Sequence, residues 1–222
     1  MKKMILQADG LSKIYVDMDN QLEVIKDASL KIQAGEFVMV AGPSGSGKST
    51  LLYLLSGLRR PSAGTVIWNG TAFSELEENQ LVRLRYEEFG FIIQQHLLVP
   101  YLNAVENVCL ARSTKLKGEA KRILTNLGLE DHLHKFPREL SYGERQRVAV
   151  ARGLVHKPRL LFADEPTASV NSELAEVIAD YLKDYCKEGG ACIMVTHDLA
   201  LLPKATRVFI LRDGVLVEKH LT

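Results

Sequence analysis

The stretch EFVMVAGPSGSGKSTLLYLLSGL, residues 36–58, decides the fold. An apolar strand pattern runs into a glycine-rich loop at residues 42–50, and the loop runs into a helical pattern. The loop fits G-x-x-x-x-G-K-[ST], in which backbone N–H groups surround a phosphate and the following helix presents its positive end. Because both flanks have the required character, we predict a phosphate-binding α/β core rather than a chance glycine-rich turn.

Every residue of this loop is a candidate contact of a nucleoside triphosphate. Lys48 is expected to reach the β- and γ-phosphates and to take part in catalysis, and the Ser49 hydroxyl is expected to bind Mg²⁺. The candidate nucleotide-binding positions are Gly42, Pro43, Ser44, Gly45, Ser46, Gly47, Lys48, Ser49 and Thr50.

Two further apolar strand patterns end in groups that suit the same chemistry. RLLFADEP, residues 159–166, carries Asp164, expected to bind Mg²⁺ through water, and Glu165, expected to orient or deprotonate the attacking water. CIMVTHD, residues 192–198, delivers His197, which could contact the γ-phosphate or hold that water. Taken alone, the carboxylates could be helix caps, and the histidine could be a capping or packed residue.

Apolar β-branched segments alternate with helical patterns, which predicts an α/β fold with a largely parallel sheet. The predicted strands are Phe37–Val40, Phe91–Ile93, Leu160–Phe162 and Cys192–Val195, followed by a hairpin over Val208–Val217 that turns at Asp213-Gly214. The clearest helix is predicted over Asn171–Lys187, ended by Gly189-Gly190, with a core-facing stripe of Leu174, Val177, Ile178, Tyr181, Leu182 and Tyr185.

The organisation along the chain is one unit with an insertion. Between about residues 95 and 157 the pattern becomes all-helical. We therefore predict a single domain over residues 1–222, with a nucleotide-binding core at 1–94 and 158–222 and an inserted helical subdomain at 95–157.

Composition argues against several classes of protein. Lys plus Arg number 28 and Asp plus Glu number 27, so the net charge of +1 provides no general field for nucleic acid. The three cysteines, an odd number without CxxC spacing, are expected to be buried thiols of a reducing compartment. The start lacks the apolar run of a signal peptide, and no window approaches the ~20 apolar residues of a membrane helix, so a soluble, cytoplasmic chain is expected.

These motifs, in this order, make the chain resemble the nucleotide-binding domain of ABC transporters over essentially its whole length. The resemblance implies the fold of an ABC ATPase cassette: a P-loop NTPase core with a mostly parallel sheet, an N-terminal antiparallel β region and an inserted α-helical subdomain. It also implies ATP and Mg²⁺ as cofactors and hydrolysis of ATP as the activity, with Lys48, Glu165 and His197 as catalytic residues.

Further positions take a role from the resemblance alone. Tyr15, expected shortly after the first strand, looks like the residue that stacks on adenine. Gln94, in GFIIQQHLL, looks like the glutamine that binds Mg²⁺ and couples it to the membrane partner, although Gln95 could fill that place. LSYGE, residues 140–144, looks like the family signature LSGGQ, and the nucleotide contacts it implies are Ser141, Gly143 and Glu144.

The resemblance also implies partners. Two cassettes, expected to be identical copies, would pair head to tail on ATP and enclose nucleotide between the phosphate loop of one and residues 141–144 of the other. Integral membrane permease subunits would receive the motion and hold the chain at the inner face of the cell membrane, and no nucleic acid partner is expected. The apolar stretch HLLVPYLNAVENV, residues 96–108, would be either the docking surface or buried packing.

Within the family, short segments such as PSAG, ADEPTAS and VFILRDG resemble the group that contains MacB, LolD and FtsE. This group implies export or lipoprotein extraction, with FtsE-like regulation through a membrane partner, without transport, as the alternative. A soluble ABC ATPase of DNA repair or translation is disfavoured by the near-neutral charge, the single cassette and the lack of a long heptad insertion.

Three residues depart from the family pattern. Tyr142 replaces the first glycine of the signature; a positive φ would strain it and weaken the contact across the dimer, whereas ordinary helix-entry angles would not. Glu144, in place of glutamine, favours the helix start but adds charge near a triphosphate. Asn171 stands where the family usually has aspartate, which keeps the capping function and loses the charge.

Overall fold

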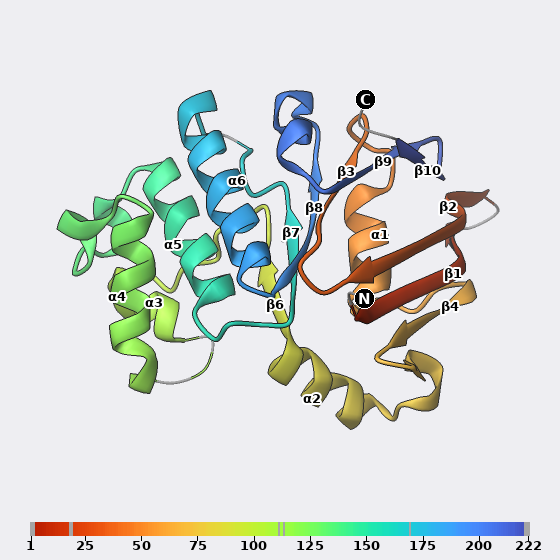
Figure 1. The fold of residues 1–222 in the computed structure, drawn as a ribbon, viewed down its shortest axis with the longest axis horizontal. Coiled ribbons are helices and arrows are strands. Elements are labelled where there is room, and N and C mark those ends of the chain that lie inside the picture. The colour runs from red at the N-terminus through yellow and green to blue at the C-terminus, as the bar shows by residue number, and fades with distance from the viewer. Residues whose placement is uncertain (1–2, 18–19, 111, 113, 169, 220–222) are drawn as a thin grey trace.

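The computed structural model describes residues 3–17, 20–110, 112, 114–168 and 170–219. Both ends of the expected 1–222 unit lie outside these described residues. Within them the strands form two sheets, and helices cover the larger sheet (Figure 1).

The larger sheet is mostly parallel, as the sequence predicts. Its order is β10-β9-β3-β8-β7-β6, in which neighbours from β9 to β6 run parallel and β10 returns antiparallel beside β9. Its strands are β3 (Phe37–Ala41), β6 (Phe89–Ile92), β7 (Leu160–Asp164), β8 (Ala191–Thr196), β9 (Arg207–Arg212) and β10 (Val215–Lys219). Since β7 is longer than predicted and includes Asp164, the sheet itself carries that carboxylate.

Helices connect the strands. α1 (Lys48–Leu55) follows the glycine-rich loop, α2 (Glu78–Glu88) precedes β6, and α6 (Ser172–Lys187) links β7 to β8. Between β6 and β7 the chain forms α3 (Ala104–Cys109), α4 (Lys117–Asn126) and α5 (Tyr142–Leu154). Short 3₁₀ turns occupy Phe73–Glu75, Thr114–Leu116, Glu130–His132, Pro137–Glu139 and Leu199–Lys204.

The central strands bury both faces, which explains their continuous apolar runs. In β3, the side chains of Phe37 and Met39 enter a core shared with α3 to α6, whereas Val38 and Val40 enter a core shared with α1 and the smaller sheet. Cys109, Cys186 and Cys192 are buried, as predicted. The glycine-rich loop therefore follows a strand that is held rigidly by packing on both of its faces.

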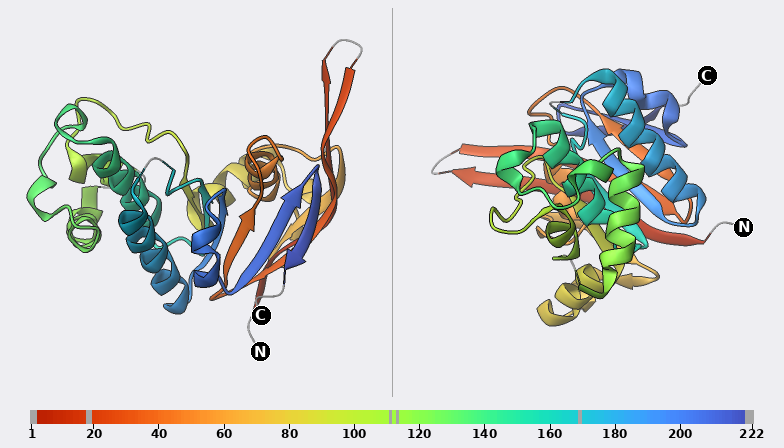
Figure 2. Two further views of the ribbon diagram at one scale, coloured as in Figure 1. Left: turned by 90° about the horizontal axis from the view of Figure 1, so that it is seen from above. Right: turned by 90° about the vertical axis from the view of Figure 1, so that its left-hand side faces the viewer.

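The smaller sheet is antiparallel and has the order β2-β1-β4-β5, with β1 (Met4–Asp17), β2 (Asn20–Gln33), β4 (Ala63–Trp68) and β5 (Thr71–Ala72). β1 and β2 form a long hairpin that projects from the body (Figure 2). Tyr15 pairs with Leu22 in this hairpin, so it lies inside the first strand and not after it as predicted. Pairing of Asp17 with Asn20 keeps β1 extended past Tyr15.

α6 forms as predicted, with one correction on its apolar stripe. Asn171 caps its start by accepting from the Leu174 N–H at 2.9 Å, and Gly189, at φ 107°, follows its end. Val177, predicted to face the core, is 42% exposed. At 100° per residue, Val177 lies roughly 160° around the helix from the centre of the buried stripe. That stripe consists of Ala175, Ile178, Ala179, Leu182 and Cys186, flanked by the partly buried Leu174, Tyr181 and Tyr185.

The inserted region is helical only from Ala104 onward. Residues 95–103, predicted to be helical, contain no helix or strand. Leu97 has a left-handed φ of 42°, and Arg152 of α5 donates to the carbonyl oxygens of His96 and Leu97 at 2.5 and 2.8 Å. A side chain therefore satisfies carbonyl groups that a helical ladder would otherwise bind.

Candidate functional site

The register of the larger sheet brings several strand ends to one edge. The terminal pairs are Ala41–Thr196, Asp164–Val195 and Ile92–Ala163. Gly42, Gln94, Glu165 and His197 follow these pairs and therefore share the carboxyl edge of the sheet, where open α/β sheets bind their ligands.

Gly42 and Gly47 occupy places that exclude a side chain. A Cβ on Gly42 would lie 2.2 Å from the carbonyl oxygen of Leu211, and one on Gly47 would lie 2.9 Å from the carbonyl oxygen of Val24. Gly47 also has a left-handed φ of 99° and caps the start of α1. The loop is thus held closely against β9 and β2 at a helix N-terminus, a geometry that suits a phosphate.

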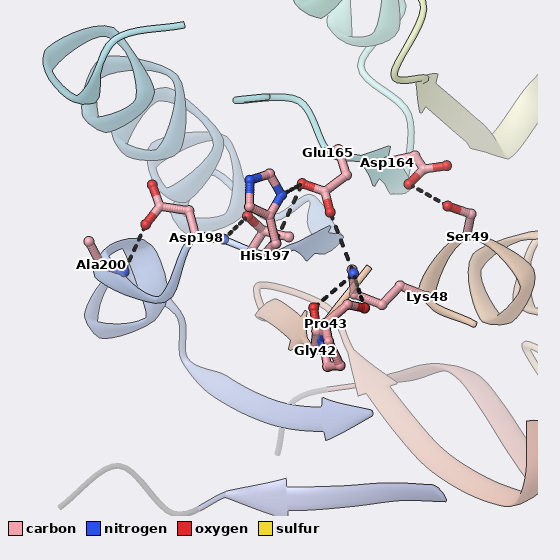
Figure 3. A network of polar contacts seen from close by, with 10 residues as sticks. Gly42, Pro43, Lys48, Ser49, Asp164, Glu165, His197, Asp198 and Ala200 are labelled. Carbon is pink, nitrogen blue, oxygen red and sulfur yellow. Dashed lines mark hydrogen bonds and ion pairs between the residues drawn. The ribbon is translucent and has the colours of Figure 1, made fainter. Parts of the chain in front are cut away.

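Lys48, the first residue of α1, is buried within the loop at 7% exposure. Its Nζ donates to the carbonyl oxygens of Gly42 and Pro43 at 2.9 and 3.0 Å and lies 3.6 Å from Glu165 Oε1 (Figure 3). Such a desolvated ammonium, held by a loop with its donors at hand, binds phosphate oxygens strongly.

Ser49 and Asp164 are in direct contact. The Ser49 hydroxyl donates to Asp164 Oδ1 at 2.9 Å (Figure 3), and Asp164 is 4% exposed. Burial raises the pKa of this carboxyl above its usual value, although the hydrogen bond from Ser49 opposes the shift. A bound cation would favour the ionised form, and Mg²⁺ takes one or two protein oxygens together with phosphate and water oxygens. The pair therefore fits Mg²⁺.

Glu165 is held between Lys48 and His197. Its Oε2 lies 2.7 Å from His197 Nδ1 and accepts from the His197 backbone N–H at 3.3 Å, while Oε1 faces Lys48 (Figure 3). Its φ of 49° is left-handed, which is uncommon outside glycine and concentrates at functional sites. With both oxygens oriented by neighbours and 9% of the residue exposed, this carboxylate can accept a proton from an adjacent water.

The alternative structural roles do not fit these contacts. Asp164 and Glu165 contact the loop serine, the loop lysine and His197 instead of capping a helix. Asp198 is the capping residue, because its Oδ1 accepts from the Ala200 N–H at 2.9 Å where the 3₁₀ turn begins. The His197 side chain is 58% exposed, so it is not a core residue.

Tyr15 lies farther along the hairpin than the loop. Gly47 approaches Val24 of β2, whereas Tyr15 pairs with Leu22, two residues nearer the tip. At about 3.3 Å per residue, Tyr15 stands roughly 7 Å beyond the contact with the loop. The Arg59 guanidinium lies 5.7 Å from the centroid of its ring. The structure therefore places Tyr15 beside the phosphate site, on an extension of its wall.

Gln94 and Gln95 follow β6 and are both exposed. Gln94 comes two residues after the Ile92–Ala163 pair, as Glu165 does on the neighbouring strand. Gln94 therefore shares the edge with Glu165, and Gln95, one residue later, remains the alternative.

The N-terminus of α5 is closed by a capping box. The Glu144 N–H donates to Ser141 Oγ at 3.3 Å, and the Ser141 N–H donates to Glu144 Oε2 at 2.7 Å. Burial raises the pKa of Glu144, but the hydrogen bonds from Ser141 and the nearby charge of His132 outweigh it, and the pKa is lowered overall. The added carboxylate is thus engaged with its own helix.

Ser141, Gly143 and Glu144 do not meet the phosphate loop of their own chain. α5 packs among α3, α4 and β6, away from α1 (Figure 1). A Cβ on Gly143 would lie 3.3 Å from the side chain of Leu174, so this turn packs against the start of α6. One chain therefore holds the two parts of the predicted site apart.

Tyr142 opens α5 without backbone strain. It lies in the first helical turn and is absent from the described non-glycine residues with positive φ. Its side chain turns toward its own chain, where its ring meets the ring of His96 edge to face, with centroids 4.2 Å apart. No motif joins these two residues, so sequence reasoning missed the contact.

The stretch 96–108 divides between the two expected roles. Val105 and Val108 are buried, whereas Leu97 and Tyr101 are 62% and 79% exposed. Arg152, which holds the Leu97 carbonyl, also lines a groove of about 350 Å³. The other lining residues include Leu58, Arg85, Tyr86, Arg112 and His156.

The chain is similar in sequence and in fold to known proteins. A family model described as ABC transporter matches residues 25–168. The lipoprotein-releasing system ATP-binding protein LolD of Idiomarina loihiensis is 42% identical over 223 residues, which cover 97% of this chain and 98% of that protein. LolD of Hydrogenovibrio crunogenus is 44% identical over 221 residues, which cover 96% of each. A dimeric structure of a post-hydrolysis state of the ATP-binding cassette MJ0796, bound to ADP and Pi, has a TM-score of 0.89 at 32% identity and covers 98% of this chain and 100% of that chain.

Proposed function

The chain belongs to the ABC transporter family and is an ATP-binding and ATP-hydrolysing subunit, and we propose that it powers a lipoprotein-releasing system. The relatives that carry this name are 42% and 44% identical over nearly the whole chain. They favour this assignment over an FtsE-like regulatory subunit that transports nothing.

The observation that carries the proposal for hydrolysis is the position of Glu165 between Lys48 and His197. In the proposed mechanism Glu165 takes a proton from the water that attacks the γ-phosphate. His197, hydrogen-bonded to Glu165 through Nδ1, holds that carboxylate in place, and its exposed ring would contact the γ-phosphate. Lys48 binds the β- and γ-phosphates and stabilises their negative charge.

Ser49 and Asp164 would hold Mg²⁺, with Gln94 as a further ligand from the neighbouring strand end. The 2.9 Å contact between Ser49 and Asp164 supports this assignment. When bound, Mg²⁺ neutralises charge on the phosphate oxygens. Tyr15 is proposed to stack on adenine, because it extends the wall of the loop outward along β1.

A second copy of the chain completes the site in this proposal. Ser141 and the backbone N–H groups near Gly143 would contact the γ-phosphate bound to the other copy, at the positive end of α5. Since Ser141 Oγ accepts a hydrogen bond in its own cap, its hydroxyl proton can still be donated to phosphate. The dimeric MJ0796 relative supports this pairing.

Membrane subunits would dock on the exposed part of residues 96–108 and the adjoining groove. Leu97 and Tyr101 offer apolar surface there, and residues 95–157 are proposed to move as a subdomain against the core formed by 1–94 and 158–222. Among helices of the described residues, none combines the length and apolar character of a membrane span. We propose that the subunit sits at the inner face of the membrane through these partners.

Replacing Glu165 by Gln tests the proposal. The amide cannot accept the proton, so we expect the ATPase rate to fall by about 10²-fold or more while ATP binding persists and the ATP-bound dimer accumulates. Glu173→Gln, an exposed position on α6, is the matched control and should keep the rate. A Glu165→Gln chain that hydrolyses ATP at the parental rate would contradict the mechanism, and release of lipoprotein from membranes with the partner subunits tests the cargo.

A further inference from the structure

The contact between Tyr142 and His96 joins two parts of the site that the sequence keeps separate. The ring planes meet at 67°, with centroids 4.2 Å apart, which is a close edge-to-face contact. Tyr142 belongs to the first turn of α5, next to Ser141 and Gly143. His96 belongs to the segment that begins with Gln94.

The same helix binds the same segment at a second place. Arg152, near the end of α5, donates to the carbonyl oxygens of His96 and Leu97 at 2.5 and 2.8 Å. These bonds hold the backbone of residue 96, and the Tyr142 ring holds its side chain. Two residues of one helix therefore fix His96 relative to α5.

This anchoring limits where Gln94 can go. β6 ends at Ile92, so Gln94 lies between a sheet strand and the anchored His96. Two residues of extended chain span at most roughly 7 Å, so Gln94 stays within that distance of His96. A shift of the first turn of α5 would therefore move the anchored end of the short segment that contains Gln94.

α5 also touches the strand end that carries Glu165. Gln146, one turn after Tyr142, is 1% exposed and donates to the Pro166 carbonyl oxygen at 2.8 Å. The first turns of α5 therefore contact the segments that follow both Gln94 and Glu165.

We propose that Tyr142 is a positioning residue: through His96, it couples the position of Gln94 to the position of the first turn of α5 in the same chain. When that turn binds the nucleotide of a second copy, it therefore also sets the position of Gln94 in the site of its own chain. The catalytic part of this inference rests on the proposed function of Gln94. The contact itself is independent of it.

The neighbourhood of His96 favours packing over hydrogen bonding. Both ring nitrogens are buried without a hydrogen-bond partner among the described residues. Burial lowers the pKa of His96 more than the neighbouring Gln146 side chain raises it, which favours the neutral ring. A phenylalanine at this position keeps an aromatic ring and has no polar atom to satisfy, so His96→Phe should preserve the coupling.

Steady-state ATPase assays test the coupling through a double-mutant cycle. Removal of one ring forfeits an edge-to-face contact, so Tyr142→Ala and His96→Ala should each lower kcat about 2- to 10-fold with little change in KM for ATP. The double variant should be no slower than the slower single variant. Tyr142→Phe and His96→Phe should retain the parental kcat. Val177→Ala, whose parent side chain is 42% exposed like Tyr142, is the control for a general loss of apolar surface.

A spin label reports on the segment without catalysis. A nitroxide on Gln95→Cys can be attached selectively, because the native cysteines are buried. Its spectrum should show faster motion in Tyr142→Ala and His96→Ala chains and parental motion in Tyr142→Phe.

Each outcome decides a separate point. Unchanged label motion in Tyr142→Ala overturns the positioning role, even if hydrolysis falls. If the fold-losses of kcat multiply in the double variant, so that their free energies add, the coupling is overturned and the two residues make separate contacts. If Gln94→Ala keeps the parental rate, the proposed function of Gln94 is wrong, and so is the catalytic part of this inference. The spin label still tests the contact between Tyr142 and His96 in that case.

Discussion

Two groups of polar residues on this chain find their partners in different ways. At the carboxyl edge of the sheet, Glu165 contacts Lys48 and His197, which come from distant parts of the sequence. At the start of α5, Ser141 and Glu144 contact each other within one turn. The first group is assembled by the fold of one chain, whereas the second is a capped helix end that packs against the start of α6.

This difference suggests how ATP controls association. In the proposed mechanism one chain binds nucleotide at the sheet edge without help, because the loop, Lys48 and the Ser49–Asp164 pair are already in place. In the proposed dimer the positive end of α5 would gain an anion to bind when a second chain presents a γ-phosphate. Loss of that phosphate on hydrolysis would then remove the attraction.

Ser141→Ala should have the largest effect, because it should weaken association of two chains without changing how one chain binds ATP. Loss of a hydrogen bond to a charged phosphate costs about 1.5–3 kcal/mol, so we expect ATP-driven dimerisation and hydrolysis to fall about 10-fold or more. Binding of ATP to the single chain, measured by calorimetry, should not change. The lost cap should lower the free energy of unfolding by about 1 kcal/mol. Ser74→Ala is an exposed serine control, and parental dimerisation of Ser141→Ala would remove α5 from the site.

Glu144→Gln should have the smallest effect and tests the capping box itself. Glutamine keeps the hydrogen bond to the Ser141 N–H, so the free energy of unfolding at pH 7 should change by less than about 1 kcal/mol. The pKa of Glu144 is lowered from 4.5, so its ionised form stabilises the fold above pH 4.5, and this contribution is lost as the pH falls through the folded pKa.

Urea unfolding at neutral pH and below pH 4.5 measures this difference. The parent chain should lose more stability than Glu144→Gln between the two conditions, because only the parent has a carboxylate to protonate. Equal losses would show that Glu144 is not stabilised in its ionised form.

The same two regions differ in how far the sequence predicted them. The sheet-edge contacts were predictable because Asp164 ends an apolar strand, Glu165 and His197 each follow one, and parallel strands end at a common edge. The Tyr142–His96 contact was not predictable, because residues 95–103 take an irregular path held by side chains such as Arg152.

Exposure explains the other errors. In β2 the buried side chains are Ile25, Ala28, Leu30 and Ile32, and none of residues 20–24 is buried, so this long strand of the hairpin had no clear apolar alternation along its length. On α6 the centre of the buried stripe is formed by small residues such as Ala175 and Ala179. The prediction took only large apolar residues into account and therefore included the exposed Val177.

In the proposed dimer each nucleotide site takes its loop from one chain and its helix end from another. The most direct measurement mixes two variants. Lys48→Ala chains are expected to lose phosphate binding by the loop, and Ser141→Ala chains are expected to lose phosphate binding by the start of α5. A mixed dimer contains one site with the intact loop of one chain and the intact α5 of the other, so the account predicts ATPase activity well above that of either variant alone. A mixture no more active than the two variants measured separately would contradict it.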